Sequence, residues 1–207
     1  MKIQSVAGKR VLFVMAAPQE YGPGLRAKID PLICGVGPIE ASLTMASCLQ
    51  QMHDHGEALD LVVSLGSAGS QTCQLGTVYQ VSEVSWRDID ATRLGFPKGV
   101  TPFVDRPASI ALSTPLVGIP AATLSTGAKV LDANDYADLG SAMADMETFA
   151  VLRACERFGL PMVGLRGISD GPGDLSAMSD WTDLLGLIDA RLADAIDVLL
   201  AHLGVAA

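Results

Sequence analysis

The sequence is short of positive charge, of histidine and of aromatic residues. Its 207 residues include 14 Lys and Arg against 23 Asp and Glu, which gives a formal net charge of −9, and aromatic residues make up 5%. Binding to nucleic-acid phosphates needs clustered Lys and Arg, so we expect no nucleic-acid partner. The three histidines are His53, His55 and His202, and none of them forms a metal-binding pattern with the acids. We therefore expect no metal and no organic cofactor.

Long apolar runs and paired cysteines are also missing. Hydrophobic residues make up 49% of the chain, but no run reaches the ~18 residues that would cross a bilayer. The first residues are too polar for a secretory signal, and the four cysteines lack the spacing of a zinc site or a disulfide framework. These absences predict a cytoplasmic protein without a membrane partner, and the length suits one domain over residues 1–207.

Short apolar segments alternate with segments of helical periodicity. We expect strands at 10–15, 59–65, 78–85, 121–126 and 162–168, and helices at 38–52, 147–158 and about 179–203. In helix 38–52 the expected buried stripe is Ile39, Leu43, Ala46 and Leu49. The alternation predicts a single-domain α/β fold with a mostly parallel central sheet flanked by helices. Such sheets bind ligands at the carboxyl ends of their strands.

Two acidic residues stand at expected junctions between strands and helices. Glu147 opens a helix, where exposed N–H groups and the helix dipole keep an acid ionised. Asp170 ends a buried strand, where partial desolvation can let an acid hold a proton for delivery. The alternatives are a dipole-favoured acid in a first helical turn and an aspartate that caps a turn. As a pair, the two acids suit cleavage of a bond between a sugar and a base.

Five segments resemble, in the same order, the methylthioadenosine/S-adenosylhomocysteine nucleosidases of the nucleoside phosphorylase family. They are residues 14–20, 34–41, 64–70, 144–148 and 163–170. The resemblance implies a nucleoside phosphorylase-like fold and hydrolysis of the N-glycosidic bond of a 5′-modified purine ribonucleoside. Methylthioadenosine and S-adenosylhomocysteine are the substrates it implies first. It also implies a homodimer, because part of the family's pocket comes from a second subunit.

The resemblance assigns a role to each candidate residue. Glu20 activates the attacking water, Asp170 protonates N7 of the purine, and Glu147 binds the ribose hydroxyls and stabilises the ribosyl cation. Ser169 orients Asp170, and Met146 packs against the sugar. The other residues we expect to bind substrate are Asp145, Ser67, Ala68, Gly69 and Val130. Arg166 matches a recurrent family position and is expected to pair with a carboxylate.

The chain departs from the family at two places. Residues 128–130 are Ala-Lys-Val where the nucleosidases carry an aromatic residue that stacks on adenine, and between residues 25 and 34 the usual strand pair is deleted or trimmed. These departures leave open another purine substrate, such as a futalosine-like or lipid-linked adenosyl compound. A phosphate-dependent purine nucleoside phosphorylase is disfavoured, because the loop 16–24 has no arginine. A non-catalytic nucleoside-binding module is the third alternative. Specificity for the 5′ substituent is expected from residues 86–103 and from Trp181.

Overall fold

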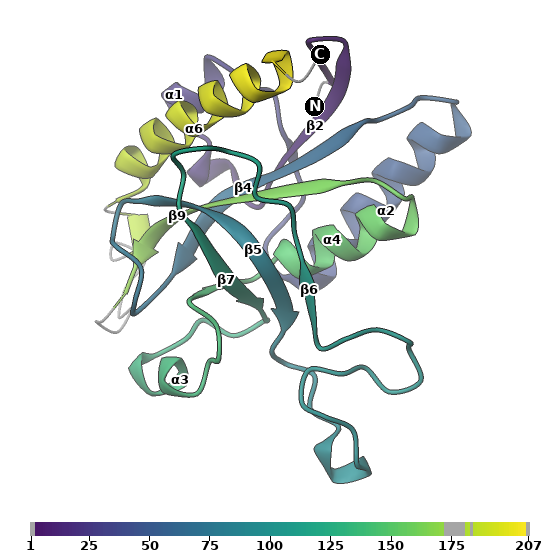
Figure 1. Cartoon of the computed structure of the whole chain (residues 1–207), viewed down its shortest axis with the longest axis vertical. Helices are drawn as coiled ribbons and strands as arrows, with labels where there is room; N and C mark the ends of the chain where they lie inside the picture. The colour runs from purple at the N-terminus through teal and green to yellow at the C-terminus, as the bar shows by residue number, and fades with distance from the viewer. Residues whose placement is uncertain (1–2, 172–180, 183, 206–207) are drawn as a thin grey trace.

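The computed structural model describes residues 3–171, 181–182 and 184–205, coloured along the chain in Figure 1. The strands are β1 (Gln4–Val6), β2 (Lys9–Met15), β3 (Leu32–Ile33), β4 (Leu61–Gly69), β5 (Val78–Trp86), β6 (Ser109–Ala111), β7 (Ala121–Thr126), β8 (Met143–Asp145) and β9 (Met162–Asp170). The helices are α1 (Pro23–Arg26), α2 (Pro38–Asp54), α3 (Ala133–Ala137), α4 (Thr148–Arg157) and α6 (Leu185–Val205), with 3-10 turns η1 (Pro18–Glu20) and η2 (Thr92–Leu94).

All five predicted strands and all three predicted helices are present. They correspond to β2, β4, β5, β7 and β9 and to α2, α4 and α6. The expected start of the last helix at residues 179–180 lies outside the described residues. The expected trimming between residues 25 and 34 is also seen, since only the one-turn helix α1 and the two-residue strand β3 lie there.

The strands in the described part of the chain form one nine-stranded sheet whose centre closes on itself. β4 pairs with β9, β9 with β5, β5 with β7, β7 with β8, and β8 returns to β4. Parallel pairs dominate this ring, but β5–β9 and β4–β8 are antiparallel, as are the edge pairs β1–β2 and β5–β6. The sheet is therefore mixed rather than purely parallel, and parallel pairs outnumber antiparallel ones, in agreement with the predicted fold class. Around a closed ring the strand direction must return to itself, so reversals come in pairs.

Helices cover both faces of the sheet. α2 and α4 lie together on one face, and α6 with α1 covers the other (Figure 1). β2 shows how the chain supplies both layers, since Leu12 and Val14 join the core under α2 and α4, while Phe13 and Met15 join the core under α6. All four side chains are at most 1% exposed. An uninterrupted apolar run is what a strand covered on both sides requires.

The buried face of α2 differs from the predicted stripe. Ala41, Met45, Leu49 and Met52 face the core, whereas Ile39 and Leu43 are 70% and 63% exposed. Apolar residues occupy two stripes of this helix, and periodicity alone does not say which of them meets the sheet. The outcome leaves an apolar surface at the N-terminal end of α2.

Candidate active site

The carboxyl ends of the central strands meet around a cavity of about 520 Å³. Gly69 at the end of β4 is paired with both Ala144 of β8 and Asp170 of β9, so three chain segments converge there. All ten site residues predicted from the sequence line this cavity. They are Glu20, Ser67, Ala68, Gly69, Val130, Asp145, Met146, Glu147, Ser169 and Asp170.

Glu20 enters the cavity from η1, directly after β2, and is 5% exposed. Its Oε1 accepts hydrogen bonds from the Ser67 backbone N–H at 2.7 Å and from Ser67 Oγ at 2.6 Å. Its Oε2 is buried and has no hydrogen-bond partner among the described residues. Burial raises the pKa of Glu20, and the two Ser67 bonds and the nearby Arg166 oppose that rise. Oε2 is therefore the oxygen left to accept a proton.

A second, small cavity of about 10 Å³ lies beneath this end of the site. Glu20, Ser67, Glu147 and Arg166 line it together with Cys34. A volume of this order is close to the minimum that one water molecule needs, about 10–15 Å³, and the lining supplies polar partners.

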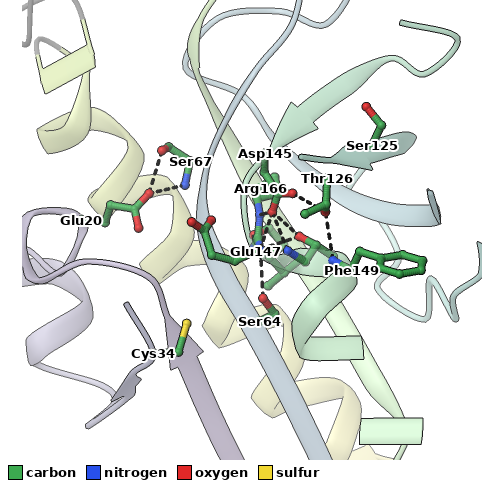
Figure 2. A network of polar contacts seen from close by, with 12 residues as sticks. Glu20, Cys34, Ser64, Ser67, Ser125, Thr126, Asp145, Glu147, Phe149 and Arg166 are labelled. Atoms are coloured by element: carbon green, nitrogen blue, oxygen red, sulfur yellow. Dashed lines mark hydrogen bonds and ion pairs between the residues drawn. The ribbon is translucent and has the colours of Figure 1, made fainter. Parts of the chain in front are cut away.

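Glu147 lies between the Glu20–Ser67 pair and the cluster around Arg166 (Figure 2). It immediately precedes α4, and its Oε1 accepts a hydrogen bond from the Gly37 N–H at 2.7 Å. Burial, with the charge of Asp145, raises the pKa of Glu147 to about 7. The side chain thus changes charge near neutral pH, inside a cavity that a ligand can enter.

Asp145 and Arg166 form a buried ion pair, with side chains 2% and 3% exposed (Figure 2). Arg166 Nε and Nη2 both donate to Asp145 Oδ2 at 3.1 Å, and the Thr148 N–H donates to the same oxygen at 3.0 Å. Asp145 Oδ1 accepts from Thr126 Oγ1 at 2.6 Å. Although Asp145 lines the cavity, protein donors occupy both of its oxygens. Its geometry supports a role in holding Arg166 and the start of α4. Arg166 pairs with a carboxylate, as the sequence predicted.

Asp170 lines the cavity from the end of β9. Ser169 Oγ donates to its Oδ1 at 2.6 Å, and the Tyr136 hydroxyl donates to Oδ2 at 3.4 Å. Burial and the Asp170 charge raise the pKa of Tyr136, so the phenol stays protonated. A Cβ on Gly69 would lie 1.9 Å from the Tyr136 hydroxyl oxygen and 2.4 Å from Asp170 Oδ2, so glycine is required there.

The arginines near the site are engaged with the protein. Arg26 is hydrogen-bonded to the Tyr21 carbonyl and lies over the Tyr21 ring, outside the cavity lining. Arg87 lines the cavity, but its Nη1 donates to the carbonyls of Ser125 and Asp145 and its Nη2 to those of Gly127 and Lys129. The loop after β2 thus presents Glu20 to the cavity and no cation.

Sequence reasoning covered Arg87 only as part of residues 86–103, without singling it out, and missed Tyr136. Arg87 follows the last residue of β5, and its position at a strand exit was an available signal. Tyr136 comes from the short helix α3, which the sequence analysis did not predict. Trp181 lines the cavity as expected, whereas from residues 86–103 only Arg87 does so. Phe103 is 94% exposed.

The described residues contain neither a membrane-spanning helix nor a metal-binding cluster. No helix among them is both long and apolar enough to cross a membrane. No group of three or more His, Cys, Asp or Glu side chains among them could hold a metal ion.

The chain is similar to one protein superfamily and to curated nucleosidases within it. The model of the phosphorylase superfamily matches residues 31–200. A 5′-methylthioadenosine/S-adenosylhomocysteine nucleosidase of Actinobacillus succinogenes is 25% identical over 188 residues, covering 82% of this chain and 79% of that protein. A nucleosidase of the same name from a Geobacillus species is 27% identical over 176 residues, covering 74% of this chain and 72% of the relative.

Solved structures resemble this chain over nearly its whole length. The adenine complex of such a nucleosidase from Colwellia psychrerythraea has a TM-score of 0.79 at 22% identity, covering 99% of this chain and 98% of the other. A futalosine hydrolase mutant from Helicobacter pylori has a TM-score of 0.76 at 18% identity, covering 92% and 98%. At these identities the likeness establishes the shared α/β fold.

Proposed function

The chain belongs to the phosphorylase superfamily, and from this membership we propose that it hydrolyses the N-glycosidic bond of a purine ribonucleoside. The substrates proposed first are those of the methylthioadenosine/S-adenosylhomocysteine type, which the names of its relatives carry. The observation that carries the proposal is that Glu20, Glu147 and Asp170 line one cavity. Glu20 and Asp170 come from different segments, and Glu147 lies between the Glu20–Ser67 pair and the cluster around Arg166.

Glu20 acts as the general base in this proposal. A water molecule beside Oε2 loses a proton to Glu20 while its oxygen forms the new bond to C1′ of the ribose. Oε2 suits this role because Ser67 occupies Oε1 and burial raises the pKa of the carboxyl group. The Arg166 charge nearby opposes this rise in the pKa of Glu20 and so favours the ionised form that a base requires.

Glu147 binds the ribose hydroxyls and faces the positive charge that develops on the sugar. The Gly37 N–H holds one of its oxygens, which leaves the other for the hydroxyls. An ionised carboxylate interacts more strongly with an oxocarbenium-like transition state than with the neutral ground state, so the interaction favours catalysis. Met146 of the same segment packs against the sugar, while Ala68 and Gly69 bring backbone close to it.

Asp170, carrying a proton, donates it to N7 of the purine as the bond from C1′ to N9 breaks. The bonding electron pair then stays on a neutral base, and general acid help of this kind gives about 10²–10⁴-fold. Ser169 and Tyr136 hold the two carboxyl oxygens in place. Each turnover leaves Glu20 with a proton and Asp170 without one, so the two groups exchange protons with solvent before the next.

Hydrolysis is favoured over phosphorolysis by the charges around Glu20. A phosphate dianion at this position would meet two buried acids, Glu20 and Glu147, while Arg166 is already paired with Asp145. A phosphorylase therefore remains the less favoured alternative.

The test is base release from methylthioadenosine, S-adenosylhomocysteine, adenosine and inosine, followed by chromatography with and without phosphate. Free adenine without phosphate, lost in a Glu147→Gln variant, would establish the hydrolase. Release that depends on phosphate would overturn the role of Glu20. Binding of all four without release would favour a non-catalytic nucleoside-binding module.

The substrate's 5′ substituent is a separate question. Val36 and Val130 line the cavity and are 56% and 58% exposed, so its mouth is apolar and open. This observation keeps a futalosine-like or lipid-linked adenosyl nucleoside as the second candidate. Adding both compounds to the panel and comparing kcat/KM separates them from the thioether substrates.

We also propose that the enzyme is a homodimer and works in the cytoplasm. Val36, which lines the cavity, and the exposed Ile39 and Leu43 at the start of α2 are apolar side chains that suit contact with a second copy of the chain. The four cysteines, all in the described part of the chain, form no disulfide, which fits a reducing compartment.

A further inference from the structure

Trp181 is joined to Glu20 through the side chain of Ser67. Its indole Nε1 donates to Ser67 Oγ at 3.0 Å, and Ser67 Oγ donates to Glu20 Oε1 at 2.6 Å. Trp181 is 114 residues from Ser67 in the sequence, and both side chains line the main cavity. The sequence had suggested only that Trp181 shapes the pocket for the 5′ substituent.

The chemistry of these groups fixes the direction of the hydrogen bonds. An indole N–H can only donate, and a hydroxyl has one proton and two lone pairs. Ser67 Oγ must therefore accept from Trp181, and its single proton is directed to the carboxylate. Without the indole, Ser67 could rotate toward other acceptors or toward solvent in the cavity.

The consequence falls on the free oxygen of Glu20. With the Ser67 hydroxyl and N–H both on Oε1, the carboxylate is held in one orientation, and Oε2 has no hydrogen-bond partner among the described residues. We propose that Trp181 is a positioning residue for Glu20, which acts through the Ser67 hydroxyl and keeps Oε2 available as the base. This inference rests on the proposed hydrolysis for its kinetic part and on the hydrogen bonds alone for its structural part.

Other charged or titratable groups near Glu20 come from several elements. Arg166 lies on β9, Glu147 precedes α4, and Cys34 follows β3, and all three line the small cavity beside Glu20. Asp189 of α6 binds the loop that follows η1. Any pH effect of Trp181 must therefore be separated from theirs by its dependence on Ser67.

The structural test needs no substrate. The chain has two tryptophans, so protein labelled with ¹⁵N-tryptophan gives two indole N–H signals, which Trp181→Phe assigns. We expect Ser67→Ala and Glu20→Gln each to shift the Trp181 signal and to leave the Trp86 signal in place. Trp86 is a matched reference because its Nε1 is buried without a hydrogen-bond partner among the described residues. A Trp181 indole N–H signal that does not shift in Ser67→Ala would overturn the inference.

The kinetic test compares the kcat and its pH profile for Trp181→Phe, Ser67→Ala and the double variant. Trp86→Phe is the control, because it makes the same Trp-to-Phe change at the other tryptophan. We expect Trp181→Phe to lower kcat about 3- to 10-fold, the range of one hydrogen bond. The acidic limb of its kcat profile should move to higher pH, because a weaker Ser67 bond raises the pKa of Glu20 further. The double variant should match Ser67→Ala alone.

Two results would contradict the positioning role. Additive losses in the double variant, or a Trp181→Phe effect confined to KM, would make Trp181 a plain pocket residue. If the wild-type protein releases no base while the Trp181 signal still responds to Ser67→Ala, the proposed function fails, but the hydrogen-bond link from Trp181 through Ser67 to Glu20 is supported. Should Trp181→Phe fold poorly, Trp86→Phe assigns the signals in its place.

Discussion

Folding and the proposed catalysis favour different charge states of the buried Glu147 carboxyl group. Burial raises its pKa from 4.5 to about 7, whereas in the unfolded chain the group titrates near its ordinary value. Between these two values the folded protein binds more protons than the unfolded chain, so this group's contribution to stability falls as pH rises through that window. The proposed chemistry needs the ionised form, which is the form that the fold disfavours.

We therefore predict that Glu147→Gln stabilises the protein above neutral pH while it abolishes base release. The gain in the free energy of unfolding should be at most about 3 kcal/mol near pH ~8 and near zero at pH ~4, where both states are protonated. Urea denaturation at the two pH values measures it. Glu40→Gln is a suitable control because Glu40 is an exposed acid in the first turn of α2. An equal gain at both pH values would contradict the role of charge.

Gly69 gives a prediction about the general acid. Gly69→Ala would place a methyl group within 2.4 Å of Asp170 Oδ2 and closer still to the Tyr136 hydroxyl, so both side chains must move. We expect kcat to fall about 100-fold, the low end of what a general acid supplies, with little change in circular dichroism. Gly186→Ala in α6, where a Cβ meets open space, should leave kcat unchanged. Normal turnover in Gly69→Ala would argue against the position of Asp170.

Among the helices, α6 holds the loop that carries Glu20. Asp189 of α6 accepts hydrogen bonds from the N–H groups of Gly22, Gly24 and Leu25, at 3.0, 2.7 and 3.1 Å. A Cβ on Gly22 would lie 2.6 Å from the Asp189 carboxyl carbon, so the backbone approaches the acid as closely as glycine allows.

Asp189→Asn should weaken this clamp, because an amide offers one acceptor oxygen where the carboxylate offers two. Hydrogen bonds to charged groups contribute about 1.5–3 kcal/mol each, so we expect the free energy of unfolding to fall by about 2–3 kcal/mol in urea. Asp197→Asn, which loses only a half-exposed pair with Lys28, should cost under about 1 kcal/mol. Equal losses in the two variants would show that Asp189 is no clamp.

Long elements were predictable and short ones were not. β2 carries a continuous apolar run, β9 is largely apolar apart from Arg166 and its last two residues, and α4 follows an acid at a strand exit, so local pattern was enough for each. β3 and β8 have two and three residues, too few for any period, and exist because neighbouring strands pair with them. The inward face of α2 likewise depends on which helix packs beside it.

At the scale of the whole molecule, the sequence predicted much of the lining of the active-site cavity. It did not predict the hydrogen bonds between the side chains that line it. The ten expected residues line it because strand ends in such a sheet lie at one edge. That both oxygens of Asp145 would be occupied, or that Tyr136 would reach Asp170, depends on side-chain geometry across segments far apart in sequence. Sequence position says which residues come to the edge, and packing decides which of them are left for a ligand.

The exposed apolar side chains at the start of α2 connect the proposed homodimer to substrate binding. Ile39 and Leu43 project from α2 into solvent, while the neighbouring Val36 lines the cavity. In the proposed homodimer these side chains are buried, so Leu43→Glu would place a charge in the contact. We expect this variant to have half the molar mass in light scattering and a KM raised about 10-fold, with unfolding little changed.

Val117→Glu makes the same change at a residue that is 92% exposed, beside Leu116 of the core under α6. We expect this control to keep both the molar mass and KM, because the α6 face is opposite the face covered by α2. A monomeric Leu43→Glu variant with an unchanged KM would separate the two properties. The second copy would then contribute to stability, and each cavity would be complete within one chain. A raised KM in the monomer would instead mean that the open, apolar side of the mouth is closed by the partner.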